Sequence, residues 1–261
     1  MEIDFYKYHG AGNDFVILDN REKEYDSIKE QQAITGICHR RFGIGADGVM
    51  MIENDPHYDF RMIYFNADGK EGSLCGNGGR CIIALAFKLG IINKQAQFMA
   101  SDGLHLAEVV NPDYVNLKML DVSIINVFDD HMELNTGSPH YIKVVPDLTN
   151  YPVYASGHKI RYSSNYPNGI NVNFIENMGD HWAIRTYERG VEDETWACGT
   201  GATAAALCSV EIEKDFSKSI VNLKAKGGDL TVKFDRKGPG YFENIWLCGG
   251  AKFIYQGNYN I

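Results

Sequence analysis

Two cysteines of this chain open the same short pattern, and a thiol in that pattern can perform acid–base chemistry. Cys75 begins the run Cys-Gly-Asn-Gly and Cys198 begins Cys-Gly-Thr-Gly. An apolar, alanine-containing run follows each of them, at 84–89 and 202–207, and predicts a buried helix preceded by glycines. Each cysteine therefore stands where the backbone N–H groups and the positive end of a helix converge.

This position favours an ionised thiol and a bound anion. A helix start lowers the pKa of a thiol from about 8.5 toward neutrality or below. The glycines let a ligand approach the N–H groups closely, and those groups can bind a carboxylate. A single cysteine in such a run is more often a packed residue than a catalyst, because free cysteines are readily buried. Because the motif occurs twice in matching contexts, a packed cysteine and a catalytic cysteine become equally good interpretations.

Two such thiols can invert a stereocentre. With a carboxylate held between two helix starts, one thiolate removes the α-proton from one face of the adjacent carbon, and the other thiol delivers a proton to the opposite face. The α-proton of an amino acid is weakly acidic, so positioning, water exclusion and N–H donors must supply most of the barrier reduction. Pyridoxal phosphate is the alternative electron sink, but no lysine stands in a convincing context for its Schiff base. If the two cysteines are catalytic, we expect an epimerase that uses no cofactor; packed, structural cysteines remain the equal alternative from the residues alone.

Short apolar runs bounded by glycine, asparagine or aspartate predict a chain rich in strands. The segment 220–234, with Lys-Gly-Gly-Asp at its centre, predicts a hairpin. The segment 28–37 predicts one amphipathic helix, with apolar positions at Ile28, Ala33, Ile34 and Ile37. Further strands are expected at 15–18, 49–52, 60–65, 115–120 and 245–247.

The repeated cysteine motif, once in each half, indicates a duplicated unit. We expect an α/β (α+β) fold of two domains, each rich in strands and wrapped around its glycine-led helix. The boundary is placed within residues 119–123, which gives domains over 1–121 and 122–249.

Composition excludes several classes of partner. The formal net charge of −9 disfavours nucleic acid and anionic membrane surfaces as partners. No apolar run is long enough to span a bilayer, and residues 1–5 lack the start of a signal peptide, so a cytoplasmic location is expected. Six cysteines are too sparse for a disulfide scaffold, and no Cys-x-x-Cys occurs, so no metal site is expected and most thiols should be buried.

Six ordered motifs resemble those of the diaminopimelate epimerase family over nearly the whole chain. They are Lys7–Phe15, Gly43–Gly48, Phe65–Gly69 leading into Cys75–Gly78, Gly137–His140, Asn171–Phe174, and Tyr187–Gly190 leading into Ala197–Gly201.

The resemblance implies interconversion of LL- and meso-2,6-diaminoheptanedioate, in lysine and peptidoglycan precursor synthesis, with Cys75 and Cys198 as the two acid–base residues. It implies two pseudo-symmetric domains with barrel-like sheets around central helices, the last strand, 250–261, returning to the first domain. It also implies a homodimer. The implied contacts to the substrate are Asn13, Asn66, Asn171, Glu188 and Arg189, with backbone at Gly76, Asn77, Gly199 and Thr200 on the reacting carboxylate. His140 and Glu188 match positions that modulate the pKa of the thiols.

The implied contacts suit the distal end of this substrate. Arg189 can fork onto the distal carboxylate, asparagines can donate and accept, and Glu188 can pair with the ammonium. Each has a structural alternative: the asparagines can make turns, and Glu188 and Arg189 can be a surface ion pair.

The chain departs from the family pattern at three places. Many members have glutamine where this chain has Gly48, and asparagine where it has Ser138. Those two contacts are not carried over from the family, because Gly48 has no side chain and Ser138 keeps only one hydrogen bond of an amide. The loop 191–195 is one residue longer than the commonest form.

Three alternatives remain at this point. A proline racemase-type isomerase shares inversion by cysteines but has no clamp for a distal amino acid. An NAD-binding oxidoreductase is suggested by the Gly-x-Gly-x-x-Gly spacing in 43–48, yet no apolar strand precedes it and no helix follows. A thiol switch would pair Cys75 with Cys198 but explains none of the polar motifs.

Overall fold

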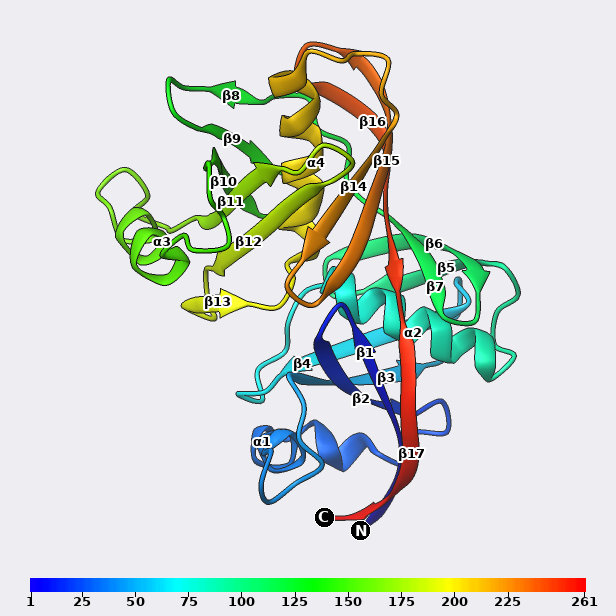
Figure 1. The fold of residues 1–261 in the computed structure, drawn as a ribbon. Helices are drawn as coiled ribbons and strands as arrows, with labels where there is room; N and C mark the ends of the chain where they lie inside the picture. Colours follow the sequence, from blue (N-terminus) through cyan, green and yellow to red (C-terminus); the bar gives the residue numbers. More distant parts are fainter. The chain divides into compact units, whose positions relative to one another are not determined.

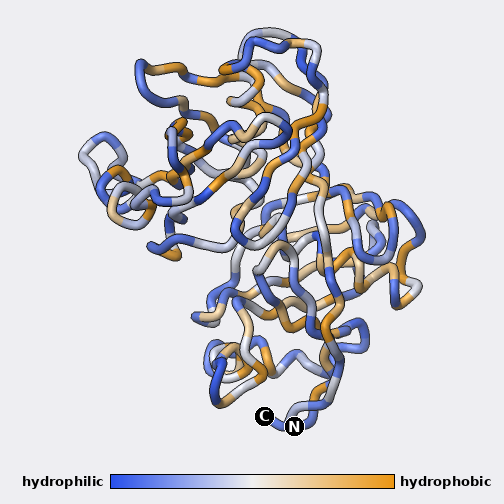
Figure 2. The backbone as a smooth tube through the Cα atoms, viewed as in Figure 1, coloured by the Kyte–Doolittle hydropathy of each residue, from blue (hydrophilic) through white to orange (hydrophobic).

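The computed structural model describes residues 1–261, and the chain divides into two compact units (Figure 1). Unit 1 comprises Met1–Leu117 and Gly249–Ile261, and unit 2 comprises Lys118–Cys248. In both units hydrophobic residues follow the strands and hydrophilic residues gather in the connecting loops (Figure 2). None of the helices is both long and apolar enough to cross a bilayer.

Unit 1 is a mixed sheet around one helix. The helix α2 (Gly76–Lys88) is buried at every position from Gly76 to Ala86 and packs against strands of the sheet on several sides. Burial on all sides favours apolar residues around the whole helix, which fits the alanine-containing run after its glycines. The strands are β1 (Glu2–Gly10), β2 (Asn13–Asp19), β3 (Gly48–Glu53), β4 (Phe60–Asn66), β5 (Gln95–Ala100), β6 (Gly103–Asn111), β7 (Tyr114–Lys118) and β17 (Lys252–Asn260).

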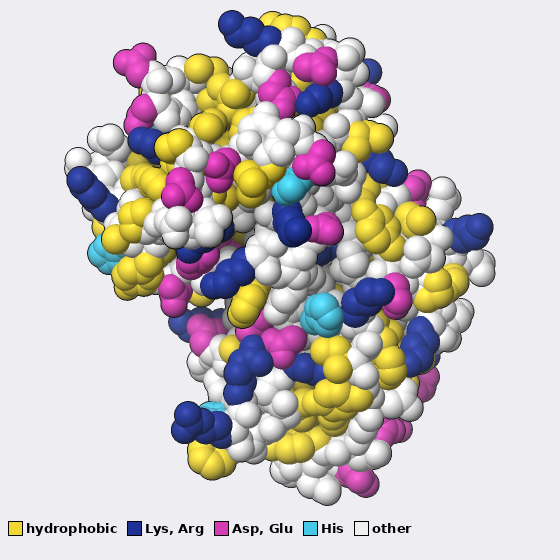
Figure 3. Space-filling view, viewed as in Figure 1, with side chains coloured by type: hydrophobic (Ala, Val, Ile, Leu, Met, Phe, Trp, Pro, Cys, Tyr) yellow, Lys and Arg dark blue, Asp and Glu magenta, His cyan; other side chains and the backbone are white.

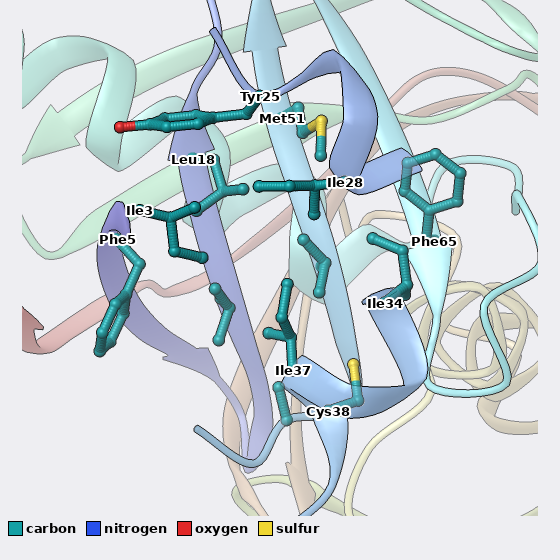
Figure 4. Packing of buried hydrophobic residues seen from close by; sticks show 13 residues of the cluster. Ile3, Phe5, Leu18, Tyr25, Ile28, Ile34, Ile37, Cys38, Met51 and Phe65 are labelled. Atoms are coloured by element: carbon teal, nitrogen blue, oxygen red, sulfur yellow. The ribbon is translucent and has the colours of Figure 1, made fainter. Parts of the chain in front are cut away.

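The outer face of this sheet has its own core. The 3-10 turn η1 (Asp26–Lys29) and the helix α1 (Gln31–Cys38) cover it, and Figure 4 shows Leu18 and Met51 of the sheet packed against Ile28, Ile34 and Ile37. Because successive strand residues face opposite sides, the alternate positions of β2, β3 and β4 face α2.

The last strand, β17, lies antiparallel to β1, with Glu2 opposite Asn260 and Phe5 opposite Gly257. Both ends of the chain therefore lie together in unit 1 (Figure 1).

Unit 2 repeats this design. Its central helix α4 (Gly199–Glu213) is buried at nearly every position up to Val210, and α3 (Val153–Arg161) covers the outer face of the sheet. The strands are β8 (Asn126–Val127), β9 (Met132–Asn135), β10 (Pro139–Val144), β11 (Asn171–Asn177), β12 (Trp182–Glu188), β13 (Asp193–Thr195), β14 (Ile220–Ala225), β15 (Gly228–Gly238) and β16 (Tyr241–Gly250).

The two units share one order of strand pairing. In unit 1 the pairs β1–β2, β2–β3, β3–β4, β4–β5 and β5–β6 alternate between antiparallel and parallel, starting with antiparallel. In unit 2 the pairs β9–β10, β10–β11, β11–β12, β12–β14 and β14–β15 follow the same order. The central helix lies between the fourth and fifth of these strands in both units. This internal correspondence fits a duplicated unit.

The register assigns equivalent residues. Phe15 lies opposite Gly48 in the parallel pair β2–β3, and His140 lies opposite Asn171 in β10–β11. Met50 faces Tyr64 across β3–β4, as Asn173 faces Thr186 across β11–β12. These pairs are compared below.

Most of the predicted elements are confirmed. The predicted strands coincide with β2, β3, β4, β7 and β16, the hairpin with β14 and β15, and both glycine-led helices begin directly after their cysteines. Two predictions were wrong in their extent. Ile28 lies in η1, because Glu30 is extended (φ −64°, ψ 134°) and separates that turn from α1. The strand expected to reach residue 120 ends at Lys118.

Candidate active site

Cys75 and Cys198 occupy the same position on their helices. Each is the N-cap residue, with extended backbone at φ −88°, ψ 123° for Cys75 and φ −110°, ψ 117° for Cys198. The thiol of Cys198 accepts a hydrogen bond from the Gly201 N–H at 3.4 Å and lies 3.4 Å from the hydroxyl of Thr200. An N–H directed at a sulfur atom favours the ionised form of a thiol.

The other four cysteines are buried, whereas Cys75 and Cys198 are half-buried. Burial raises the pKa of Cys38 to about 11 and also raises the pKa of Cys81 and Cys208. These three thiols stay protonated and unreactive at neutral pH. The expectation that most cysteines are small buried residues is therefore confirmed.

A chain of amides in unit 1 links the start of α2 to the turn between β1 and β2. Asn77 donates to the Asn13 side-chain oxygen at 2.8 Å, and Asn13 donates to the Asp47 carboxylate at 2.8 Å. Arg80, which is completely buried, donates to the Asn77 side-chain oxygen at 2.8 Å and to the Gly76 carbonyl at 3.1 Å. Three of the residues implied by the family, Asn13, Gly76 and Asn77, are thus held in one network by an arginine.

Asn66 lies at the end of β4, next to Gly48 on β3. Its side-chain oxygen accepts a hydrogen bond from the Tyr64 hydroxyl at 3.0 Å. The amide is exposed to solvent, and its contact to the Lys70 carbonyl is long, at 3.5 Å. The structural alternative, a turn-forming asparagine, is also met, because the Gly69 N–H donates to the Asn66 carbonyl.

In unit 2, Asn171 and Ser138 surround Arg189. Asn171 donates to the Ser138 hydroxyl at 2.8 Å and accepts from the Arg189 backbone N–H at 3.0 Å. The Arg189 guanidinium makes only long contacts, at 3.3 Å to the Asn168 carbonyl and 3.4 Å to Ser138. It is half-buried and makes no ion pair, so the surface-pair alternative with Glu188 does not apply.

Glu188 and Thr200 are held by threonines. The Thr195 hydroxyl donates to the Glu188 carboxylate at 2.5 Å, and the Thr136 hydroxyl donates to the Thr200 carbonyl at 2.9 Å. Thr195 belongs to β13, which forms in the lengthened loop and pairs with the end of β12. The loop thus supports the Glu188 side chain.

His140 is completely buried and neutral. Burial, with a further effect of the Arg189 charge, lowers its pKa to about 3. Asn173 donates to His140 Nδ1 at 3.1 Å and to the Tyr141 carbonyl, and accepts from the Thr186 hydroxyl at 2.9 Å. Since Nδ1 accepts, the hydrogen is on Nε2, which has no partner in the protein. His140 therefore presents a dipole, not a positive charge, to its surroundings.

The sequence interpretation missed the residues that support the implied contacts. Asn173 lies inside a recognised motif and Arg80 lies two residues after another, but nothing was assigned to them. A signal for Asn173 existed: it alternates with Asn171 and so faces the same side of β11. Tyr64 gave no signal, because its position in an apolar run predicts only a strand.

The dinucleotide-binding alternative is not met by the structure. The segment 43–48 leads from α1 into β3, whereas a phosphate-binding turn leads from a strand into a helix.

Comparisons with known proteins agree with the motifs. A family model described as diaminopimelate epimerase matches residues 5–124 and 132–253. The diaminopimelate epimerase of Flavobacterium psychrophilum is 45% identical, over 96% of this chain and 98% of that protein. That of Chlorobaculum tepidum is 42% identical, over 95% of this chain and 98% of that protein.

Solved structures show the same fold at low sequence identity. A PhzF-family phenazine biosynthesis protein of Bacillus anthracis matches with a TM-score of 0.80 at 16% identity, over 100% of both chains. A hydroxyproline epimerase of Agrobacterium vitis matches with a TM-score of 0.70 at 14% identity, over 98% of this chain and 92% of that one. The predicted fold class and the resemblance are both confirmed, and the chain belongs to the diaminopimelate epimerase family.

Proposed function

We propose that this protein is an isomerase that interconverts LL- and meso-2,6-diaminoheptanedioate, with Cys75 and Cys198 as its two acid–base residues. Family membership supports the reaction. One observation supports the residues: the two half-buried cysteines are both N-cap residues of buried, glycine-led helices. In this proposal one thiolate removes the α-proton and the other thiol returns a proton to the opposite face.

The reacting carboxylate binds backbone N–H groups of Gly76 and Asn77 and of Gly199 and Thr200. The first N–H groups of a helix have no acceptor within the helix, so an anion finds donors there that need no rearrangement. The same donors stabilise the negative charge that grows on the carboxylate as the α-proton leaves. The chemistry needs no electron sink from a cofactor if this stabilisation suffices.

The distal amino acid of the substrate binds Asn13, Asn66, Asn171, Glu188 and Arg189. Arg189 supports this assignment best, because a half-buried guanidinium without a carboxylate partner is suited to a substrate carboxylate. Such a site rejects molecules that lack the distal groups, since its polar side chains would then be unpaired. This separates the proposal from a proline racemase-type activity.

His140 and Glu188 tune the thiols. A neutral imidazole cannot act as a charge, so His140 acts through its Nε2–H dipole and by holding Asn173 beneath the first turn of α4. Glu188 acts through its carboxyl group, which the Thr195 hydroxyl holds in place.

We further propose a cytoplasmic homodimer. The cytoplasm keeps thiols reduced, which two-thiol catalysis requires. Hydrophobic side chains gather over β1 and β17 (Figure 3), and Phe253, Ile254 and Tyr255 of β17 are 38–48% exposed. An exposed apolar strand of this kind indicates a protein interface. Sedimentation equilibrium at the mass of one chain would contradict the dimer.

The decisive experiment incubates the purified protein with LL-diaminoheptanedioate in deuterium oxide, with and without added pyridoxal phosphate. We expect deuterium at the inverted carbon, formation of the meso isomer, and no effect of the added cofactor. Turnover of proline in place of diaminoheptanedioate would favour the racemase alternative. Activity that survives the double substitution Cys75→Ser with Cys198→Ser would remove the two cysteines from the mechanism.

A further inference from the structure

The space that Gly48 leaves is filled by the ring of Tyr64. A Cβ atom at Gly48 would lie 2.6 Å from Cε2 and 3.1 Å from the hydroxyl of Tyr64. A Cβ at Gly72 would lie 2.9 Å from both Cδ1 and Cε1 of the same ring. Contacts under about 3 Å between carbon atoms are strongly repulsive. The ring therefore fits between two backbone segments only because both positions are glycine.

The Tyr64 ring is held in place on its remaining side. Its side chain is 9% exposed and faces α2, as its alternate position on β4 requires. The ring of Phe15 contacts it edge to face, with centroids 6.2 Å apart and planes at 73°. The hydroxyl is thus carried by a rigid aromatic ring to a defined point beside Asn66.

The hydroxyl determines which way the Asn66 amide points. It donates to the Asn66 oxygen at 3.0 Å, so the amide nitrogen is the end that remains for another acceptor. The only contact of that nitrogen within the protein is the 3.5 Å one to the Lys70 carbonyl, at the limit of a hydrogen bond. A donor held in this way is suited to a carboxylate oxygen.

We propose that Tyr64 is a positioning residue for substrate: it fixes Asn66 with its amide nitrogen toward the distal carboxylate. The ring of Tyr64 on β4 lies against Gly48 on β3, where no side chain competes for the space. The inference rests on the proposed function and assigns a residue that the family motifs do not contain. Gly48 and Gly72 then make room for the tyrosine, although a Cβ at Gly48 would also meet the Phe65 carbonyl oxygen, at 2.5 Å.

The test measures steady-state epimerisation of diaminoheptanedioate. Tyr64→Phe removes the hydroxyl and keeps the ring, so we expect kcat/KM to fall about 3- to 10-fold, the usual effect of one hydrogen bond, mostly through KM. In an Asn66→Ala background the same change should alter kcat/KM by less than about two-fold, because the hydroxyl acts through Asn66. Tyr25→Phe is the control: it removes a buried hydroxyl on the other face of the same sheet, where it bonds the Asp4 N–H, and should leave kcat/KM unchanged.

A second pair of variants tests whether the Tyr64 ring needs the space that the neighbouring glycines leave. Gly72→Ala should lower kcat/KM while Tyr64 is present, because its Cβ would meet the Tyr64 ring at 2.9 Å, and should lower it less when added to Tyr64→Ala. Thermal unfolding of each variant verifies that it is folded. An active wild type with an unaffected Tyr64→Phe variant overturns the inference, as does an equal loss in the Asn66→Ala background. A wild type that does not epimerise the substrate overturns the proposed function instead.

Discussion

Gly78 of unit 1 and Gly201 of unit 2 both stand three residues after their cysteines, and the side chains beneath them are different in kind. A Cβ at Gly78 would meet the sulfur of Met50 at 3.1 Å and the ring of Phe15 at 3.4 Å. A Cβ at Gly201 would collide with the side-chain oxygen of Asn173. The strand register makes Met50 equivalent to Asn173, and Phe15 equivalent to His140. One helix start rests on an apolar layer and the other on a polar one.

Five residues after each cysteine the difference is the opposite, because the more polar residue is then the one in unit 1. In unit 1 it is Arg80, whose buried guanidinium donates to the carbonyl of Gly76. In unit 2 it is Thr203, whose hydroxyl donates to the equivalent carbonyl, that of Gly199, at 3.0 Å. In unit 1 the side chains beneath the helix start are apolar, and the helix itself contains the charged Arg80. In unit 2 the side chains beneath the helix start are polar, and the helix contains the neutral hydroxyl of Thr203. The two units share the geometry of the helix start but differ in which of the neighbouring side chains are polar.

The largest effect is expected at the cysteines, and it tests whether the two helix starts contribute alike. Cys75→Ser and Cys198→Ser should each lower net epimerisation by about 10²- to 10⁴-fold, the range of general acid–base catalysis. Each variant should still exchange the α-proton from one stereoisomer, and the two variants should prefer opposite isomers. Deuterium uptake from each isomer measures this. Wild-type turnover in either variant would contradict the two-base assignment.

Arg80→Met tests the charged support of unit 1. It removes the bonds to Gly76 and Asn77 while keeping most of the buried volume, and should lower the free energy of unfolding by about 2–3 kcal/mol. The first turn of α2 also loses a buried cation, so iodoacetamide should alkylate Cys75 more slowly at pH 7. Alkylation of Cys198, followed by mass spectrometry of the same samples, is the internal control. Equal slowing at both cysteines would refute a local role for Arg80.

His140→Phe copies the equivalent residue of unit 1 into unit 2 and tests the polar layer by pH. The folded pKa of His140, about 3, lies below the unfolded value of about 6.5. Between these values the unfolded state binds one more proton, so wild-type stability falls as the pH falls, by roughly 1.4 kcal/mol per pH unit. From pH 6 to pH 4 the wild type should lose about 2 kcal/mol more stability than the variant. Urea unfolding at both pH values measures the difference, and parallel curves would show that His140 is not buried neutral.

Thr203→Val should have the smallest effect. It removes one hydrogen bond to the Gly199 carbonyl at constant shape, and should cost about 1 kcal/mol of stability. Alkylation of Cys198 should stay within about two-fold of the wild-type rate, because no charge is lost. If Thr203→Val lowered stability or the alkylation rate more than Arg80→Met does, the charged arginine would not be the stronger support of the two.

Much of the fold was predictable because its signals are local. The glycines after Cys75 and Cys198 and the apolar runs behind them require helices that start at those residues and are buried all round. Alternation fixed the strands, and the Lys-Gly-Gly-Asp run fixed the hairpin of β14 and β15. The prediction failed at Ile28, which was joined to the apolar positions of the following helix: the extended Glu30 ends the turn that contains Ile28 before α1 begins.

The sequence by itself determined the chemistry available at the two cysteines, because the residue type and the helix start both depend only on residues close by in the sequence. Only the tertiary structure decided how that chemistry is supported. Asn173 joins His140 to Thr186, and Tyr64 fills the space beside Gly48, through contacts between strands that are separate along the chain. Neither hydrophobic periodicity nor a sequence motif predicts such contacts, since they depend on the register in which the strands pair.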